Sequence, residues 1–229
     1  MSALGLPRRH ERVTESTNAL AQSLAGAGAP HGTLVTAREQ RAGRGRQGRR
    51  WHAPGGSALL TSLVLRDPAA LLALLAAVAV AETVERISGE RAGIKWPNDV
   101  LLDDRKVAGI LIEGRPHERW AVLGIGLNVA VAVDDLPAEL RDSAGTLGRR
   151  PDEIELALEE LLAGLARWLD STDADVLASW LARDVLAGKP VRWSDGSGLA
   201  AGIDDRGRLL VDNSQGRTAL AAGEVHLLR

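Results

Sequence analysis

Residues 95–129 read KWPNDVLLDDRKVAGILIEGRPHERWAVLGIGLNV, and this stretch predicts the centre of a β-sheet. Its apolar residues fall into runs over 100–102, 106–113 and 120–131, each bounded by polar or glycine residues as strands are. The Asp-Asp pair at 103–104 separates the first two runs, as the turn of a β-hairpin does. We therefore expect consecutive strands joined by turns in this part of the chain.

The segment KWPND at 95–99 carries side chains able to recognise a nucleotide. Trp96 offers a flat apolar face, Asn98 an amide and Asp99 a carboxylate, which together suit a purine and its ribose. The alternative is a strand–turn junction in which Asn98 and Asp99 make a local side-chain turn. The segment alone leaves both interpretations open.

Two further positions in the expected strands point to a ligand. Lys106 is one of three lysines in the chain, and in RKVAGILIE at 105–113 small residues follow it, where a compact cation fits better than a guanidinium. In GIGLNV at 124–129, two glycines allow close approach to the backbone, and Asn128 needs a partner if it is buried. A solvated turn lysine and a β-bulge are the alternatives.

The stretch 38–56 has no apolar periodicity and is expected to be a long loop. Six arginines and one glutamate lie in 38–50, with glycines at 43, 45 and 48 that match G-x-G-x-x-G. No amphipathic helix opens after Gly48 and no Gly-Lys-Ser/Thr ending is present, so neither a dinucleotide fold nor a P-loop is indicated. Glycines and guanidinium groups suit a loop that folds over a polyanion. A solvated basic loop and an RNA-binding arginine–glycine segment are the alternatives.

Helices and further strands are expected on both sides of these segments. Ser16 or Thr17 can cap a helix to about residue 27, and Asp67 with Pro68 can start another to about residue 88. The remaining expected elements are strands over 33–37 and 57–65 and helices over 151–169 and 173–186. From Gly188 the composition changes to four or five short strands separated by turns, which predicts a small all-β unit.

Composition excludes several classes of protein. The 229 residues include no cysteine, so disulfides, cysteine-ligated metals and cysteine nucleophiles are impossible. A formal net charge of −2 argues against a polybasic nucleic-acid binder. No secretory signal opens the chain, and the longest apolar run, over 68–81, is shorter than the roughly 20 residues that a membrane span needs. We expect a cytoplasmic protein that does not insert in a membrane.

Five segments in order carry a family resemblance: ESTN at 15–18, the Arg/Gly loop ending at Trp51, KWPND, RKVAGILIE and GIGLNV. In these motifs the chain closely resembles the biotin protein ligases, over about residues 13–229. The resemblance implies an α+β fold, with a mixed β-sheet backed by helices as in class II aminoacyl-tRNA synthetases. It also implies a catalytic domain over 1–187 and a small SH3-like β-barrel over 188–229.

The resemblance implies a two-step activity. Biotin is activated with Mg·ATP to biotinyl-5′-AMP and is then transferred to a lysine of a biotin carboxyl carrier domain, from an acyl-CoA carboxylase or pyruvate carboxylase. Few residues precede the ESTN segment, so we expect the monofunctional type, without the DNA-binding domain that some relatives carry and without operator binding. The motifs do not decide between a monomer and a homodimer.

Motif matching also implies the site residues, with Lys106, Arg46 and Asp99 at the catalytic centre. Asp99 is expected to help place Mg²⁺ or the nucleotide, and the loop is expected to be disordered without ligand. The residues implied to bind biotin are Ser16, Thr17, Asn18, Gln40, Arg44, Gly45, Arg46, Lys106, Gly124 and Gly126. Those implied to bind ATP are Arg46, Arg49, Trp51, Asn98, Lys106 and Asn128.

Two other functions compete with this interpretation. A lipoate or octanoate ligase of the same superfamily typically carries an Arg-Arg-x-Ser-Gly-Gly-Gly loop and a His-Asp pair, and neither is present. An RNA-binding module would use the Arg/Gly loop but leaves KWPND and RKVAGILIE unexplained. The segment 133–143 matches by position the family's loop over the adenine end, with little aromatic or glycine character.

Overall fold

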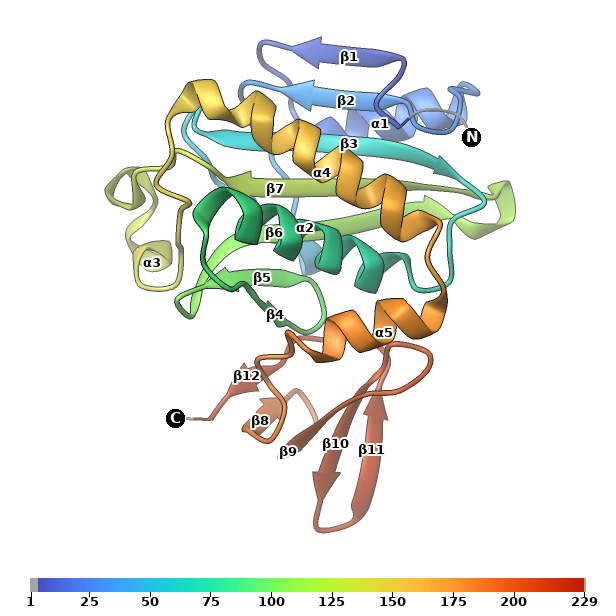
Figure 1. Ribbon diagram of the computed structural model, residues 1–229, viewed down its shortest axis with the longest axis vertical. Helices are drawn as coiled ribbons and strands as arrows, with labels where there is room; N and C mark the ends of the chain where they lie inside the picture. The colour runs from blue at the N-terminus through green and yellow to red at the C-terminus, as the bar shows by residue number, and fades with distance from the viewer. Residues whose placement is uncertain (1–3, 229) are drawn as a thin grey trace.

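A seven-stranded mixed sheet forms the centre of the molecule (Figure 1). The computed structural model describes residues 4–228. The strand order is β1-β2-β3-β7-β6-β5-β4; β1 runs parallel to β2, and the other neighbours are antiparallel. The strands are β1 (Arg8–Glu11), β2 (Leu34–Ala37), β3 (Ala58–Arg66), β4 (Gly93–Lys95), β5 (Asp99–Leu102), β6 (Arg105–Arg115) and β7 (Trp120–Asn128). The expected run of consecutive strands over 95–129 is thus confirmed as β5, β6 and β7.

One face of this sheet is the main core. Alternate residues of β7, namely Leu123, Ile125 and Leu127, are fully or almost fully buried on that face, as the two-residue period of a strand requires. Two helices, α2 (Leu72–Ser88) and α4 (Ile154–Leu169), pack on it and lie in front of the sheet in Figure 1. Both are rich in alanine and leucine, so they pack closely on the sheet and on each other.

Helix α1 (Thr17–Gly26) covers only part of the opposite face (Figure 1). Ser16 caps it by accepting a hydrogen bond from the backbone N–H of Ala19, as predicted. Its buried residues Ala21 and Ala25 pack with Val35 and Val122 in a separate small core. Beyond α1, the same face carries Gly109 of β6 and the glycines of β7, and the site described below lies there.

A second sheet of five strands follows, in the order β11-β10-β9-β8-β12. It is antiparallel and remains open, with β11 and β12 at its edges, so the expected barrel is not closed. The sheet packs on the first unit where the indole N–H of Trp96 donates to the carbonyl of Gly207, 3.0 Å away. Its strands are β8 (Pro190–Trp193), β9 (Gly196–Ile203), β10 (Leu209–Asn213), β11 (Gly216–Leu220) and β12 (His226–Leu227).

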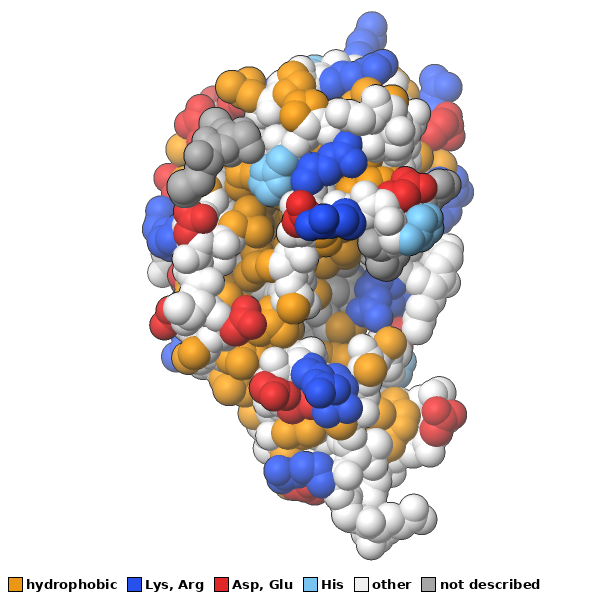
Figure 2. Space-filling model, turned by 90° about the vertical axis from the view of Figure 1, so that its right-hand side faces the viewer, with side chains coloured by type: hydrophobic (Ala, Val, Ile, Leu, Met, Phe, Trp, Pro, Cys, Tyr) orange, Lys and Arg blue, Asp and Glu red, His pale blue; other side chains and the backbone are white. Residues whose placement is uncertain are grey.

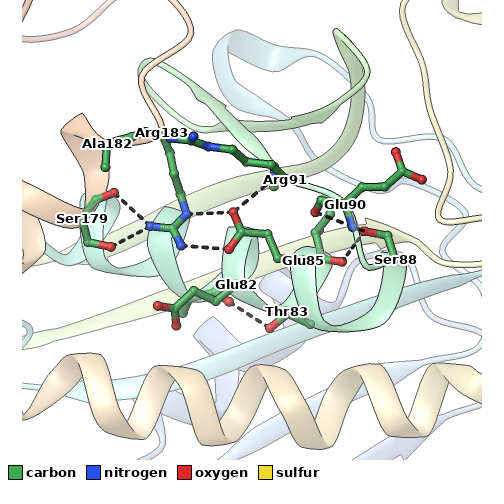
Figure 3. Close-up of polar contacts among 12 residues, drawn as sticks. Glu82, Thr83, Glu85, Ser88, Glu90, Arg91, Ser179, Ala182 and Arg183 are labelled. Carbon is green, nitrogen blue, oxygen red and sulfur yellow. Dashed lines mark hydrogen bonds and ion pairs between the residues drawn. The ribbon is translucent and has the colours of Figure 1, made fainter.

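Helix α5 (Asp173–Leu181) leads to the second sheet and is fixed to α2 by an ion pair (Figure 3). The guanidinium of Arg183 donates from Nε and Nη2 to the two carboxylate oxygens of Glu85, at 3.1 and 2.8 Å. Its Nη1 also donates to the hydroxyl of Ser179 at 2.8 Å. This two-pronged contact is partly buried, which makes it more specific than an exposed pair.

Three expectations about element boundaries are wrong or incomplete. The helix expected from Pro68 begins at Leu72, because Asp67 adopts a positive φ of 48° and pairs with Arg119 instead of capping. The helix expected to reach residue 186 ends at Leu181, since the chain then turns to bridge Ile94 at Asp184. Strand β1 was not predicted, because its sequence RRHE has no apolar residue.

Basic and acidic side chains are interspersed on the face drawn in Figure 2, with apolar side chains between them. Among the described residues, no helix combines the length and the apolar character needed to cross a bilayer.

Candidate active site

The sheet face beside α1 provides a platform for the indole of Trp51. A Cβ at Gly126 would lie 2.5 Å from Cε2 of that ring, and a Cβ at Gly109 would lie 3.0 Å from Cζ3. Real Cβ contacts are never as short as the first of these distances. Gly109 and Gly126 are paired across β6 and β7, so both strands leave room for the same ring. The close approach that two strand glycines predict is therefore made by Trp51.

Lys106 lies beside this platform, at the start of β6. Its Nζ is 2.6 Å from Oδ1 of Asp99 on the neighbouring strand and 5.8 Å from the centre of the Trp51 ring. The side chain of Lys106 is about one-third exposed, so an anion can reach it from solvent. The structure therefore places residues of two other motifs, Asp99 and Trp51, beside the Lys106 cation.

The second half of the Arg/Gly loop reaches the KWPND segment and the C-terminal sheet. Arg46 donates to the side-chain oxygen of Asn98 at 3.3 Å, and Arg49 forms an ion pair with Glu224 at 2.6 Å. Burial lowers the pKa of Arg46 from its ordinary value, and the neighbouring Arg49 adds to the effect, although Asp99 and Glu224 oppose it. Arg46 still carries its charge at neutral pH, because the ordinary value is far above 7.

The first half of the loop is fixed to the start of α1. The side-chain oxygen of Gln40 accepts hydrogen bonds from the backbone N–H of Thr17 at 2.8 Å and from its hydroxyl at 3.1 Å. Thr17 and Ser16 are both buried. Three residues predicted to bind biotin therefore meet at one corner of the site.

Asn18 and Arg44 meet at a residue that sequence reasoning missed. The carboxylate of Glu113 accepts a hydrogen bond from Nδ2 of Asn18 at 2.9 Å and contacts Nη1 of Arg44 at 3.4 Å. Glu224, the partner of Arg49, was also missed. Glu113 is the last residue of the RKVAGILIE motif but was assigned no role, and Glu224 stands outside every motif. Only the spatial pairing with a motif arginine marks either glutamate.

Asn128 is predicted to bind ATP and is buried in the structure. Its Nδ2 donates to the carbonyl of Gly145 at 2.8 Å, whereas its Oδ1 is buried without a partner among the described residues. The indole N–H of Trp51 is likewise buried and has no partner in that part of the chain. Buried polar atoms are normally hydrogen-bonded, so these two atoms are open positions in the predicted nucleotide region.

The segment over 133–143 lies beside Lys106. It contains a short helix, α3 (Ala138–Arg141), and ends where the backbone N–H of Lys106 donates to the carbonyl of Ser143 at 2.7 Å. The side chains of Leu136 and Leu140 belong to the small cluster that Trp51 packs against. The segment therefore borders both the lysine and the indole.

The groove between the loop and the C-terminal sheet is nearly closed. Arg46, Asn98 and Glu224 contribute to its walls, and it holds only about 10 Å³ of free space. Small-molecule sites usually enclose several hundred Å³, so this groove is too small for a nucleotide in the conformation that the structure shows. The structure shows the loop in one conformation, and its disorder without ligand stays a prediction.

A larger pocket of about 540 Å³ lies elsewhere, between the ends of β1 and β2. None of its lining residues belongs to the predicted site; they are Glu11, Arg12, Val13, Arg38, Glu39 and Arg41. The volume of a pocket therefore does not identify the site in this molecule.

Trp96 does not offer its ring to a nucleotide, as the sequence had suggested. Its side chain is 3% exposed, belongs to the main core and donates to Gly207 of the C-terminal unit. Its indole therefore joins the two sheets instead of presenting a face to a purine. The indole available to the site is that of Trp51.

The described part of the chain provides no complete set of side-chain ligands for a metal ion. Among residues 4–228, no group of three or more histidine, aspartate or glutamate side chains could hold one. Asp99 is a single carboxylate beside Lys106. One carboxylate suits Mg²⁺ that arrives with phosphate oxygens, since this ion commonly binds one or two carboxylates plus substrate phosphates.

Comparison with known families defines the class. The model of the biotin/lipoate A/B protein ligase family matches residues 10–129, and that of the biotin protein ligase C-terminal domain matches residues 188–228. The first match spans the Arg/Gly loop and every strand of the platform. The chain therefore belongs to the biotin/lipoate A/B protein ligase family, and its second unit matches the C-terminal domain of the biotin protein ligases.

Individual relatives narrow the class. The chain is 39% identical to the biotin–[acetyl-CoA-carboxylase] ligase of Paracoccus denitrificans, over 93% of this chain and 97% of that protein. It is 37% identical to the bifunctional ligase/repressor BirA of Bacillus spizizenii, over 95% of this chain and 73% of that protein. A solved structure of biotin protein ligase from Aquifex aeolicus, in complex with biotin and ATP, matches with a TM-score of 0.80 and 27% identity, over 97% of this chain and 98% of that one.

Proposed function

We propose that this protein is an ATP-dependent biotin ligase. It activates biotin as biotinyl-5′-AMP and transfers it to a lysine of a biotin carboxyl carrier domain. One observation carries the proposal. Lys106, Asp99 and Trp51, which come from three motifs, lie together on one face of the sheet, where glycines leave room for the indole ring. Membership of the family and the likeness to a ligase solved with biotin and ATP support it.

In the first half-reaction, an oxygen of the biotin carboxylate attacks the α-phosphorus of ATP. The bond to the leaving pyrophosphate breaks, and a mixed anhydride forms. Negative charge develops between the carboxylate and the α-phosphate, and we assign Lys106 to that position, because a fixed cation there stabilises the transition state. Arg46 and Arg49 are assigned to the phosphates, with Asp99 helping to place Mg²⁺, which neutralises phosphate charge when it is bound.

Trp51, Asn98 and Asn128 are assigned to the adenylate. The unpaired indole N–H of Trp51 and the unpaired oxygen of Asn128 are a donor and an acceptor of the kind that a nucleotide satisfies. Asn98 is tied to Arg46 and to the backbone of β6, so it links the loop to the platform. These groups support positioning as the main source of catalysis.

In the second half-reaction, the amine of the carrier lysine attacks the carbonyl carbon of the anhydride. The carbon–oxygen bond breaks, AMP leaves, and the amine loses a proton to water. Lys106 lies where it can stabilise the charge on the carbonyl oxygen and on AMP in this step too. No enzyme nucleophile is needed, which agrees with a chain without cysteine.

We assign biotin to the corner made by α1 and the first half of the loop. Thr17 and Gln40 are joined there, with Ser16 beside them and Arg44, Gly45 and Arg46 following in the loop. The residues 1–187 are proposed as the catalytic domain and 188–229 as a C-terminal domain. We also propose cytoplasmic action, with a carboxylase carrier domain as partner, as the name of the Paracoccus denitrificans relative indicates for that protein.

Mass spectrometry of a carrier protein tests the proposal. The purified protein is mixed with ATP, Mg²⁺, biotin and either a biotin carboxyl carrier domain or a lipoyl domain, and a second series replaces biotin with lipoate. We expect one biotinyl group on one lysine of the biotin carrier only. Transfer of lipoate to the lipoyl domain would instead support the lipoate ligase alternative, and no transfer in any mixture would contradict both.

A further inference from the structure

Asn18 is a buried residue whose amide is already used by the protein. It is 4% exposed, its Nδ2 donates to Glu113 at 2.9 Å and to the carbonyl of Leu111 at 3.4 Å, and its Oδ1 accepts from Ser62 at 2.6 Å. A side-chain amide can donate two hydrogens and accept through one oxygen. Both hydrogens of the Asn18 amide are therefore used within the protein, and its oxygen holds one hydrogen bond, from Ser62.

Gly124 makes room for this amide. A Cβ at Gly124 would lie 2.0 Å from Oδ1 of Asn18, 2.7 Å from Cγ and 2.9 Å from Nδ2, and these are its three nearest atoms. The two glycines of the GIGLNV motif thus have different roles. The missing side chain at Gly126 leaves room for the ring of Trp51, whereas the missing side chain at Gly124 leaves room for Asn18.

Ser62 and Glu113 connect this buried amide to the Arg/Gly loop at two places. The hydroxyl of Ser62 is fully buried and lies 2.9 Å from the hydroxyl of Thr17, which in turn donates to Gln40 at the start of the loop. The carboxylate of Glu113 has one oxygen on Asn18 and the other facing Arg44, four residues further along the loop. The loop segment 40–44 is therefore fixed at both ends by one polar cluster.

We propose that Glu113 is a positioning residue, which Asn18 orients so that its carboxylate holds Arg44 and keeps the Arg/Gly loop over the biotin end of the site. The inference rests on the proposed function, because it concerns retention of biotinyl-5′-AMP between the two half-reactions. An ionised carboxylate accepts both contacts, and a neutral amide at the same place cannot. Ser62 and Gly124 act through Asn18, by bonding it and by leaving it space.

The first test compares Glu113→Gln with Glu155→Gln. Glutamine keeps an oxygen for Asn18 but offers Arg44 no charge, whereas Glu155 pairs with Arg8 outside the site. For Glu113→Gln we expect biotin-dependent exchange of pyrophosphate into ATP with kcat within about threefold, and release of adenylate, read as biotinylation of bystander lysines, raised about three- to fivefold, as the loss of one partly exposed ion pair allows. Glu155→Gln and the conservative Glu113→Asp are expected to stay within about twofold of the unmodified protein in release.

Arg44→Gln is expected to raise release as much as Glu113→Gln, and the double variant no further, because both changes remove the same contact. Additive effects of the two changes, or unchanged release in Glu113→Gln, would overturn the proposal. If the kcat of Glu113→Gln fell in proportion to the fraction of folded protein, Glu113 would have a purely structural role. That result would also overturn the proposal.

The second test is a size swap between two residues. Gly124→Ala is expected to raise release of adenylate about as much as Glu113→Gln, since its methyl group displaces the amide of Asn18, which orients Glu113. Asn18→Ala removes that amide, so the double variant is expected to match Asn18→Ala alone within about twofold. If the space at Gly124 served a substrate instead, the double variant would release more adenylate than either single variant. Gly124→Ala would then have the same effect with or without the side chain of Asn18.

Thermal unfolding of the same four proteins gives a readout independent of activity. The penalty of Gly124→Ala on the midpoint is expected to disappear in the Asn18→Ala background, even if the proposed reaction is absent. Absence of pyrophosphate exchange in the unmodified protein would therefore overturn the proposed function alone. A persistent penalty in the double variant would overturn the inference alone.

Discussion

The two halves of the Arg/Gly loop are held in different ways. The first half is fixed by two partly buried hydrogen bonds that Gln40 accepts from Thr17, and by the partly exposed pair of Arg44 with Glu113, whose carboxylate also accepts from Asn18. The second half is held by partly exposed contacts, from Arg46 to Asn98 and from Arg49 to Glu224, and it closes a groove with almost no free space. We therefore predict that the first half, which we assign to biotin, keeps its arrangement when ligands bind, and that the second half, which we assign to the nucleotide, moves.

This difference has a physical basis. Buried hydrogen bonds are expensive to leave unmade, so the first half of the loop is expected to keep its arrangement. Ion pairs between partly exposed side chains contribute about 0–1 kcal/mol each. If Arg49 binds the triphosphate as proposed, a phosphate can replace the carboxylate of Glu224 on Arg49 at little cost.

The largest effect on pyrophosphate exchange is expected from Lys106, which we place between the assigned biotin and nucleotide ends of the site. Lys106→Ala removes the cation between the assigned carboxylate and α-phosphate, and should lower pyrophosphate exchange roughly 100- to 1,000-fold while the protein stays folded. Lys189→Ala changes an exposed lysine outside the site and should leave exchange unchanged. Near-normal exchange in Lys106→Ala would remove that residue from the centre of the mechanism.

Arg46→Gly should weaken the nucleotide half most, because Arg46 is assigned to the phosphates as well as to biotin. We expect the KM for ATP and the release of adenylate each to rise about tenfold, because a charge-assisted contact is lost, with a smaller rise in the KM for biotin. Bystander biotinylation followed by mass spectrometry measures the release. Arg206→Gly, in an exposed turn of the C-terminal unit, is the matched control. Tight retention of the adenylate in Arg46→Gly would contradict the closing role.

Glu224→Gln tests the second half of the loop in the opposite direction, because it is expected to strengthen ATP binding, whereas Arg46→Gly is expected to weaken it. Without a competing carboxylate on Arg49, the apparent affinity for ATP should rise about two- to fivefold, which corresponds to the loss of one exposed ion pair. Equilibrium binding of ATP measures this change. Asp212→Asn, which breaks the pair with Arg217 in the same unit, should leave the affinity as it is. Weaker ATP binding in Glu224→Gln would show that the glutamate supports the site and does not compete for Arg49.

The smallest effect concerns stability where the two sheets join. Asp184 accepts a hydrogen bond from the backbone of Leu186 through Oδ1, and its Oδ2 is buried with no partner among residues 4–228. Burial raises the pKa of Asp184, although backbone hydrogen bonds and Lys189 oppose the effect. A carboxyl group whose folded pKa is raised contributes stability at low pH, and that contribution is lost as the pH rises through the folded value.

Asp184→Asn should therefore stabilise the protein at neutral pH. We expect the melting temperature to rise by on the order of 2 °C at about pH 7 and to match the unmodified protein at about pH 3, where the aspartate is protonated. Thermal unfolding at both pH values measures the difference. Asp195→Asn, in an exposed turn, controls for the loss of one charge. An equal change at both pH values would contradict the account of Asp184.

Local pattern predicted the elements whose own residues determine them. The strands of 95–129 and helix α4 have clear apolar periods, and the structure contains them. Strand β1 escaped prediction because pairing with β2, and not its own RRHE sequence, makes it a strand. The start of α2 was placed too early because the capping side chain of Asp67 is taken by Arg119, 52 positions away in the chain.

The candidate site was predicted by its motifs but not by their partners. Lys106, Trp51 and Asp99 were identified from sequence, and the structure places them together. Glu113 closes the RKVAGILIE motif, but its charge alone does not indicate a partner, and Glu224 stands in no motif. The ion pair of Arg49 and Glu224 spans 175 positions, a distance that no pattern of spacing reports. The roles of all these residues toward biotin and ATP stay predictions.

Exchange of labelled pyrophosphate into ATP by the purified protein tests the central claim most directly, because adenylation needs no carrier. The account predicts exchange that depends on biotin, is not supported by lipoate, and is lost in Lys106→Ala. Exchange with lipoate in place of biotin would mean that the pocket is assigned to the wrong acid. A folded protein that supports no exchange with either acid would contradict the claim that this site forms an adenylate.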